Sequence, residues 1–236
     1  MKLLQNFCEP LIKNKSLGIL VILIVIGLFI INFRVYIFKD YFELYSALNN
    51  IMIGVFVSYV FYVLVVYIPE KEKKDAMKKS LLFHYKDFKK EAISIFLDAA
   101  DIRYVKDDKI TKLCDLNEFK EFFKEANKSK KVEGTTKWDG VLNGLDANEY
   151  LQNKLLMEME ILRNEVLFIL NNTEIDDQEI SMFLKRFSQS IYRLRHLKSD
   201  FDDMKTKPNF LWDLFTGWSP MGYLDKDIIK EMIKKI

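Results

Sequence analysis

The pattern of hydrophobic and polar positions divides the chain into two contrasting parts. Two uninterrupted apolar runs, at residues 17–33 and 51–68, contain no charged residue. After Pro69, apolar residues instead recur at helical spacing between many Lys and Glu residues. A helix needs roughly 20 apolar residues to cross about 30 Å of hydrocarbon, and each run is close to that length. The pattern therefore predicts a membrane hairpin followed by an amphipathic helical domain.

We expect the chain to be organised in three segments. An amphipathic N-terminal segment should cover residues 1–16 and a transmembrane hairpin residues 17–69. A cytoplasmic helical domain should cover residues 70–236. Within the hairpin, the first span should cover about residues 17–38 and the second span about residues 49–69. An outer loop at about residues 39–48 should connect them.

The distribution of basic residues predicts the orientation of this hairpin. Three lysines precede the first run and five lie within residues 70–79, whereas the connection at residues 34–50 has two basic residues offset by two acidic ones. Cytoplasmic flanks of membrane spans carry an excess of Lys and Arg. We therefore expect a multi-pass protein with both termini in the cytoplasm. The many Lys, Ile and Asn residues suggest an AT-rich bacterial genome, which would place the protein in the inner (plasma) membrane.

The predicted fold class is all-α: a two-helix transmembrane hairpin followed by a cytoplasmic helical bundle. Apolar residues in steps of three and four indicate one helix at about residues 70–101. The strongest pattern covers residues 150–170 and 180–204, separated by the polar turn 171–177. Two long helices with a short connection form an antiparallel pair. The few Gly and Pro residues, 8 and 4, suit an all-helical chain because both interrupt helices.

The segments between these helices carry weaker signals. Residues 102–112 and 127–144 are predicted to be loops. Asp115, followed by Glu118 in capping-box spacing, predicts the start of a short helix between them. A last helix is expected at residues 225–236.

No established catalytic motif is present. The sequence lacks a phosphate-binding loop, GxSxG, HExxH and a dinucleotide-binding glycine pattern. The two cysteines, Cys8 and Cys114, show no metal-binding spacing and are expected to be reduced thiols. A net charge of +2 gives no reason to expect nucleic acid binding. We therefore expect no enzymatic activity, no cofactor and no nucleic acid partner.

One weak candidate for a metal site is the trio His196, Asp200 and Asp203. These residues are spaced to share one helical face, and an imidazole with two carboxylates can bind a divalent cation. Such spacing is also routine on a solvated helix face, which is the interpretation we favour. An enzyme built around the same trio is the most distant functional alternative.

The helix predicted at residues 178–204 has a basic face. Its side chains could pair with glutamates of the preceding helix, or could bind an anionic ligand such as a nucleotide. Both interpretations remain open from the sequence. The basic residues are Lys185, Arg186, Arg193 and Arg195, and the glutamates are Glu158, Glu160 and Glu165.

Two further features are candidate contact surfaces. Gly54 and Ser58 are four residues apart on the second span, and such small-residue pairs let another membrane helix approach closely. The C-terminal region is rich in aromatic residues, which either cap the bundle core or form an interface. Its interface candidates are Trp212, Phe215, Trp218, Tyr223, Lys230 and Lys234.

These features favour a non-enzymatic, membrane-anchored interaction or scaffold protein. Its partners would be the lipid bilayer and either another protein or a second copy of itself. The main alternative is a pore-forming, membrane-perturbing effector that is controlled by its cytoplasmic domain, as in bacterial defence or stress systems. The resemblance to such effectors is one of layout alone.

Overall fold

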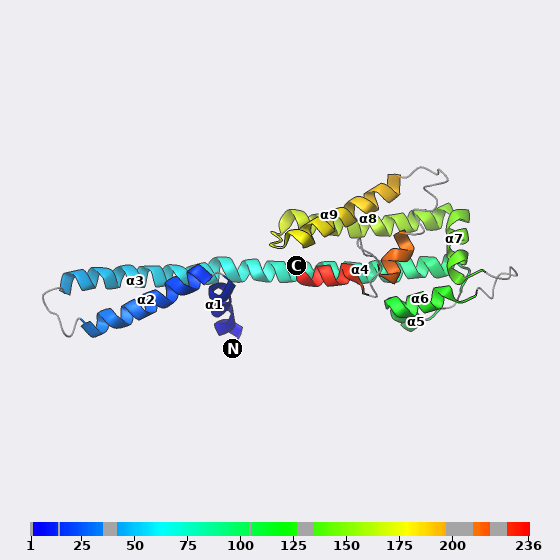
Figure 1. The fold of residues 1–236 in the computed structure, drawn as a ribbon. Helices are drawn as coiled ribbons and strands as arrows, with labels where there is room; N and C mark the ends of the chain where they lie inside the picture. The colour runs from blue at the N-terminus through cyan, green and yellow to red at the C-terminus, as the bar shows by residue number, and fades with distance from the viewer. Residues whose placement is uncertain are drawn as a thin grey trace. The chain divides into compact units, whose positions relative to one another are not determined.

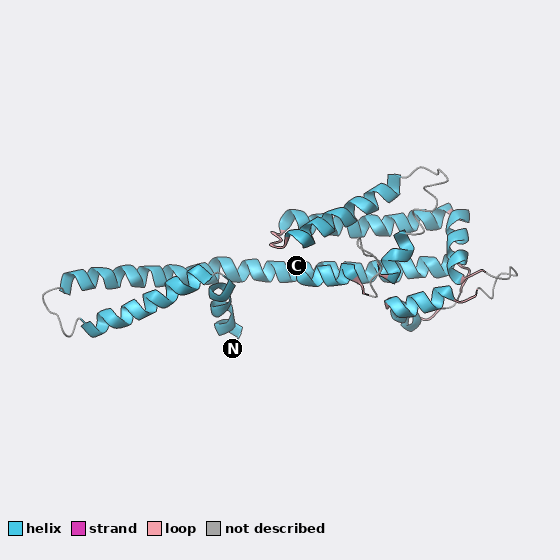
Figure 2. Ribbon diagram, viewed as in Figure 1, coloured by secondary structure: helices cyan, strands magenta, loops and turns pink. Residues whose placement is uncertain are grey.

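The computed structural model describes residues 2–13, 15–34, 42–103, 105–126, 135–196, 210–217 and 226–236. Throughout these residues the regular structure is helical (Figure 2). The one extended pairing among them is an isolated antiparallel bridge between Ala126 and Thr136. The all-α prediction is confirmed for this part of the chain.

The chain divides into two compact units, Met1–Asp75 and Ala76–Ile236. The first contains α1 (Lys2–Lys13), α2 (Lys15–Arg34), α3 (Phe42–Tyr62) and a single wide π-helical turn, η2 (Val63–Tyr67). Helix α4 (Ile68–Ala99) begins in the first unit and contributes most of its length to the second.

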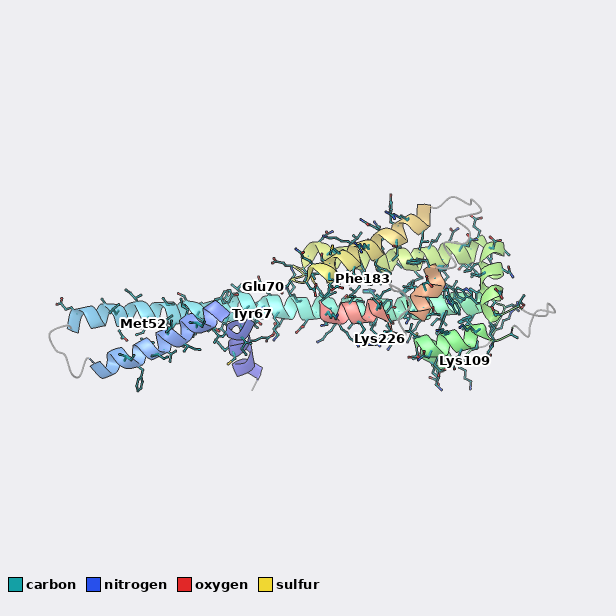
Figure 3. The ribbon with its side chains drawn as sticks, in the orientation of Figure 1. Met52, Tyr67, Glu70, Lys109, Phe183 and Lys226 are labelled. Atoms are coloured by element: carbon teal, nitrogen blue, oxygen red, sulfur yellow. The ribbon has the colours of Figure 1, made fainter. Side chains whose placement is uncertain are left out.

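In the first unit α2 and α3 lie against each other (Figure 1). Gly27 of α2 permits the close approach, because a Cβ at that position would lie 2.7 Å from Met52 Cε of α3. Met52 is labelled in Figure 3. Helix α1 contacts the π turn, and the Tyr59 hydroxyl donates a hydrogen bond of 2.7 Å to the Phe7 carbonyl.

Apolar side chains cover the outside of the first unit. Phe29 is 74% exposed and Val65 is 65% exposed. One helix of the described residues, Ser46–Ala99, is long and apolar enough to cross a membrane, and 11% of its most apolar window is buried. A shorter apolar helix covers Gly18–Ile30.

The helix does not end at Pro69. The Ile68 N–H donates to the Val63 carbonyl, which widens the turn directly before the proline. Proline has no N–H to donate, so it always removes one bond from a helix interior. A π turn reorganises the hydrogen bonds at such a point, and the helix continues into α4.

The second unit is a helical domain around one hydrophobic core. Helices α8 and α9 lie side by side (Figure 1) and are joined by residues 173–177. The core draws on every helix of this unit, including the helical residues 210–216. Its other helices are α5 (Asp107–Leu113), α6 (Leu116–Lys124), α7 (Lys137–Ala147), α8 (Glu149–Asn172), α9 (Gln178–His196) and α11 (Ile228–Lys235).

Two of the predicted loops are partly helical, so those predictions are wrong in part. Residues 107–112 lie in α5, and residues 137–144 lie in α7. Helix α7 starts with a capping box, in which the Thr136 side chain accepts from the Asp139 N–H and the Asp139 carboxylate accepts from the Thr136 N–H. This box satisfies two backbone donors and outweighs the glycines that suggested a loop. The predicted cap at Asp115 is confirmed, since its side chain accepts from two backbone N–H groups.

An aromatic cluster forms the centre of the core. The Phe96 ring on α4 lies 5.2 Å from the Phe215 ring and 5.4 Å from the Trp138 ring, centroid to centroid. Trp138 in turn lies 5.0 Å from Trp212. The two pairs of Phe96 are edge-to-face, and such pairs stabilise a core beyond their buried area. Residues 210–216 are helical, and Trp212 and Phe215 of this helix belong to the cluster.

Candidate functional site: a lysine, a tyrosine and an aspartate beneath the C-terminal helix

The most unusual polar arrangement among the described residues is a buried lysine in the second unit. The Lys89 side chain is 5% exposed, and its Nζ donates 2.9 Å hydrogen bonds to Asp227 Oδ2 and to the Cys114 carbonyl. The Tyr85 hydroxyl donates to the other carboxylate oxygen of Asp227 at 2.8 Å. Tyr85 and Lys89 are one turn apart on α4, so both side chains reach the same aspartate.

The surroundings favour charge pairing at this site. An isolated ammonium inside a protein loses its hydration, and the cost is recovered only with good partners. Besides Asp227, the Lys89 Nζ lies 5.5 Å from the Tyr85 ring centroid and 5.8 Å from that of Phe215. Burial, and then the charge of Asp227, raise the pKa of Tyr85 well above its usual value. The phenol therefore stays protonated and keeps its hydrogen bond.

Asp227 also positions the last helix. It is the N-cap of α11, and its Oδ1 accepts from the Lys230 N–H at 3.1 Å. Further along, Lys78 of α4 donates to the Lys234 carbonyl near the C-terminal end of α11. The bonds of Asp227 to Tyr85 and Lys89 attach the start of α11 to α4, and the bond from Lys78 attaches its end. Chemically the cluster acts as a structural tie that holds one carboxylate against two donors.

A cleft of about 810 Å³ opens beside this cluster. Lys226, labelled in Figure 3, lies at its edge. The Cys114 thiol lines the cleft as well, and burial raises its pKa, which makes it a poor nucleophile at neutral pH. The lining charges are mixed, so the cleft does not select for one sign of ligand: they come from Lys86, Lys89, Lys226, Lys230, Asp115, Asp227 and Glu231.

The interface candidates from the aromatic C-terminal region fall into separate groups. Phe215 is 1% exposed and Trp212 is partly buried, and both pack in the aromatic cluster. This placement agrees with the alternative that they cap the core. Trp218 and Tyr223 lie outside the described residues.

The basic C-terminal candidates, by contrast, lie at the surface. Lys230 is exposed and lines the cleft, whereas the Lys234 Nζ pairs with Glu231 at 2.8 Å. That ion pair lowers the pKa of the Glu231 carboxyl. The predicted interface residues therefore do not form one patch in the described part of the chain.

The candidate metal trio is not described by the structure. His196 ends α9 but its side chain is not described, and Asp200 and Asp203 lie outside the described residues. Elsewhere in the described ranges, no three His, Cys, Asp or Glu side chains are grouped to hold a metal ion.

The basic face of α9 is partly paired with α8. Arg195 lies 3.6 Å from Glu160, which also contacts Arg163 at 2.8 Å. Lys185, Arg186 and Arg193 are exposed.

Gly54 and Ser58 lie on an exposed face of α3. The Ser58 Oγ donates to the Gly54 carbonyl at 2.9 Å, and a Cβ added to Gly54 would meet no described atom within 4 Å. Gly27 of α2, by contrast, does face a neighbouring helix. The Gly54–Ser58 face therefore remains a prediction for contacts with another chain.

Sequence reasoning missed two features. Lys89 interrupts an otherwise apolar face of α4, and a charge at a core position signals a buried partner. The second is a set of exposed apolar side chains on α8, which recur at helical spacing outside the core pattern. They are Tyr150, Met157, Ile161 and Phe168.

Comparison with known proteins identifies no family for this chain: no family model, no curated protein and no solved structure matches it.

Proposed function

We propose that this chain is a membrane-anchored, non-enzymatic interaction protein. Residues 17–69 form a two-span hairpin in the inner membrane, both termini are cytoplasmic, and the second unit, with α8 and α9 as an antiparallel pair, binds a protein partner or a second copy. The observation that carries the proposal is the exposed apolar surface of the first unit, where 11% of the most apolar window is buried.

Water is a poor solvent for such a surface. Soluble monomers rarely expose contiguous apolar patches of more than a few hundred Å². Here exposed apolar side chains recur along α2, from Ile19 to Ile30, and along α3 and η2, from Leu48 to Val66. Helix α2, with 20 residues, is about 30 Å long, which matches the hydrocarbon thickness of a bilayer. A lipid environment would bury these side chains without any protein partner.

The charges near both ends of the first unit support the orientation. Lys71 forms an ion pair with Glu9, so two segments expected on the cytoplasmic side contact each other. More lysines follow on α4, including Lys73 and Lys74. Each basic residue near an anionic membrane surface contributes roughly 1 kcal/mol of attraction.

Membrane topology is the first test of the proposal. Membranes are washed with carbonate, and intact cells are treated with a thiol reagent that does not cross the membrane. We expect the chain to stay in the pellet. We expect a Ser46→Cys variant to be labelled from outside, whereas Cys8 reacts only after permeabilisation, which provides an internal control. Release by carbonate, or labelling of Cys8 in intact cells, contradicts the proposal.

Partner binding is the second test. The chain is crosslinked in membranes and purified through a C-terminal tag. We expect a crosslinked species that contains a second protein or a second copy. A chain that stays monomeric in detergent and yields no crosslinked species refutes the interaction role while leaving membrane anchoring intact.

A membrane-perturbing effector remains the second candidate, and the open face at Gly54 favours it. A face without a neighbour within 4 Å can accept a helix from another chain. Induced expression should then collapse the membrane potential, and Gly54→Leu should prevent this. An unchanged potential on expression of the native chain excludes this candidate.

A further inference from the structure

Helix α8 carries a second apolar face that the fold does not bury. Tyr150 is 72% exposed, Met157 54%, Ile161 46% and Phe168 52%. At 3.6 residues per turn, the four side chains lie within about 20° of one line along the helix. We call these four residues the exposed stripe.

The exposed stripe lies roughly opposite the side of α8 that faces the core. Helices that are apolar on one side bury that side, and an additional apolar face indicates an additional contact. The stripe follows the repeat of a two-stranded coiled coil, with steps of seven, four and seven residues. The core-facing residues of α8 are Leu155, Met159, Leu162, Val166 and Ile169.

We infer that the exposed stripe pairs with the same stripe of a second copy in an antiparallel, two-fold symmetric contact. The inference rests on the proposed function and specifies its partner. Position 159 is the midpoint of the stripe, so reversing the second helix places Met157 against Ile161 and Tyr150 against Phe168. Each of these pairs then joins two apolar side chains, one from each copy, and the two-fold symmetry makes each pair occur twice.

The charge pattern selects this direction. Lys154 is the charged residue along the line of the stripe, and its side chain is 33% exposed and 3.8 Å from Glu91. In the antiparallel register Lys154 faces Asn164, whose amide oxygen can accept a hydrogen bond. A parallel register would instead place Lys154 against its own copy, and facing like charges disfavour that pairing.

The flanking glutamates are compatible with this contact. Glu160 is already paired with Arg163 and Arg195 of its own chain. Glu158 lies beside the expected two-fold axis. Burial and the neighbouring Glu91 raise the pKa of its carboxyl, while Lys154 opposes the shift. A carboxyl that protonates more readily is less costly to bring near its own copy.

The small area of the exposed stripe indicates a weak contact between two copies. Attachment of both chains to one membrane would strengthen this contact. About half of each large side chain is exposed, or on the order of 100 Å², so two copies would bury roughly 800 Å² of stripe surface. Contacts of this size lie at the low end of specific interfaces. Two chains tethered to one bilayer meet at a high effective concentration, which makes a weak contact sufficient.

The test measures self-association of full-length chains in membranes. Chains with two different affinity tags are co-expressed, crosslinked in membranes and purified through one tag, and recovery of the second tag is measured. We expect the native chains to co-purify. Met157→Lys, introduced into both chains, should lower recovery of the second tag at least about tenfold, and so should Ile161→Glu. Each substitution places a charge against an apolar side chain of the second copy.

Charge exchange makes the register falsifiable. Co-expression of a Met157→Lys chain with an Ile161→Glu chain should restore recovery, since the introduced charges face each other. Met182→Lys on α9 is the matched control, because Met182 is 51% exposed and lies off the stripe. All variants should keep the native thermal midpoint and the native resistance to carbonate, which separates this test from that of membrane anchoring.

Three results overturn the inference. In the first, native chains do not co-purify. In the second, Met182→Lys lowers recovery as much as Met157→Lys. In the third, Gly54→Leu lowers recovery of the second tag and the stripe variants do not, which would assign self-association to the hairpin.

Discussion

Two phenylalanines summarise the contrast between the two units. Phe29 in α2 is 74% exposed, and Phe96 in α4 is 0% exposed. Both lie in helices, so secondary structure does not separate them. The second unit buries the rings of its central aromatic cluster, whereas the first exposes apolar side chains along its helices. The direction in which comparable apolar side chains face therefore distinguishes the two units.

Gly144 and Gly54 have opposite surroundings. Gly144 of α7 lies so close to the end of α4 that a Cβ there would be 1.8 Å from the Ala99 carbonyl oxygen. A Cβ at Gly54 of α3 would meet no described atom within 4 Å. Both units use glycines where helices approach closely, Gly27 in the first and Gly144 in the second, whereas Gly54 lies on an open surface.

The largest expected effect comes from removing a core ring. Phe96→Ala should lower the free energy of unfolding by about 3–5 kcal/mol, because it leaves a cavity inside the aromatic cluster. Phe29→Ala, the matched control, should change it by no more than about 0.5 kcal/mol. Denaturant titration in detergent, followed by tryptophan fluorescence, compares the two. Equal losses would mean that Phe29 is buried by protein.

The buried lysine gives the next largest effect. Lys89→Ala should cost about 3 kcal/mol, because it leaves the Asp227 carboxylate without its ammonium partner. The double variant Lys89→Met/Asp227→Asn removes both charges and keeps a residue that can cap α11, so it should recover most of the loss. Thermal unfolding of the single and double variants measures the difference. A double variant as unstable as Lys89→Ala would show that the charges themselves are required.

A smaller effect is expected at the glycine contact. Gly144→Ala should destabilise the second unit by about 1–3 kcal/mol, because the clash involves a backbone oxygen that cannot rotate away. Gly54→Ala should leave the unfolding midpoint unchanged. Thermal melts of both variants provide the comparison, and unfolding midpoints that match the native one for Gly144→Ala would disprove the close contact.

The smallest effect concerns pH. Burial raises the pKa of the Asp213 carboxyl above its ordinary value. The folded state therefore binds this proton more readily than the unfolded state, and the resulting stabilisation is present at low pH and lost as pH rises through the folded pKa. Asp213→Asn should thus raise the thermal midpoint slightly at pH 7. It should also remove the contribution of Asp213 to the change in thermal midpoint between pH 7 and pH 4. An identical pH dependence in both proteins would contradict a raised pKa of the partly buried Asp213 carboxyl.

Helical periodicity predicted much of the fold because each helix of the second unit buries one regular stripe. The Leu155 to Ile169 pattern of α8 and the N-cap at Asp115 are both local signals, readable from neighbouring residues. Helix α7 was missed although its capping box is local too, because Gly140 and Gly144 lower helix propensity. In the structure, Gly140 is buried and Gly144 lies against α4, so tertiary packing overrides that propensity.

The candidate site could not be predicted in the same way. Lys89 is visible in the sequence as a charge on an apolar face, but its partner Asp227 is 138 residues away. No local pattern specifies that pair, and Tyr85 looks like an ordinary core residue until its hydroxyl finds the same carboxylate. The exposed stripe of α8 was hidden for a different reason: from the sequence, a wide apolar pattern is indistinguishable from a broad core face.

The link between Lys89 and Asp227 also sets an order of events during synthesis. Helix α4 leaves the ribosome long before residue 227, so a nascent chain carries Lys89 without the carboxylate that neutralises it. An unpaired ammonium resists burial, and the growing domain keeps that part of α4 hydrated. Final closure of the core therefore waits for α11. Translation intermediates halted before residue 227 should be more sensitive to proteases than chains that include Asp227.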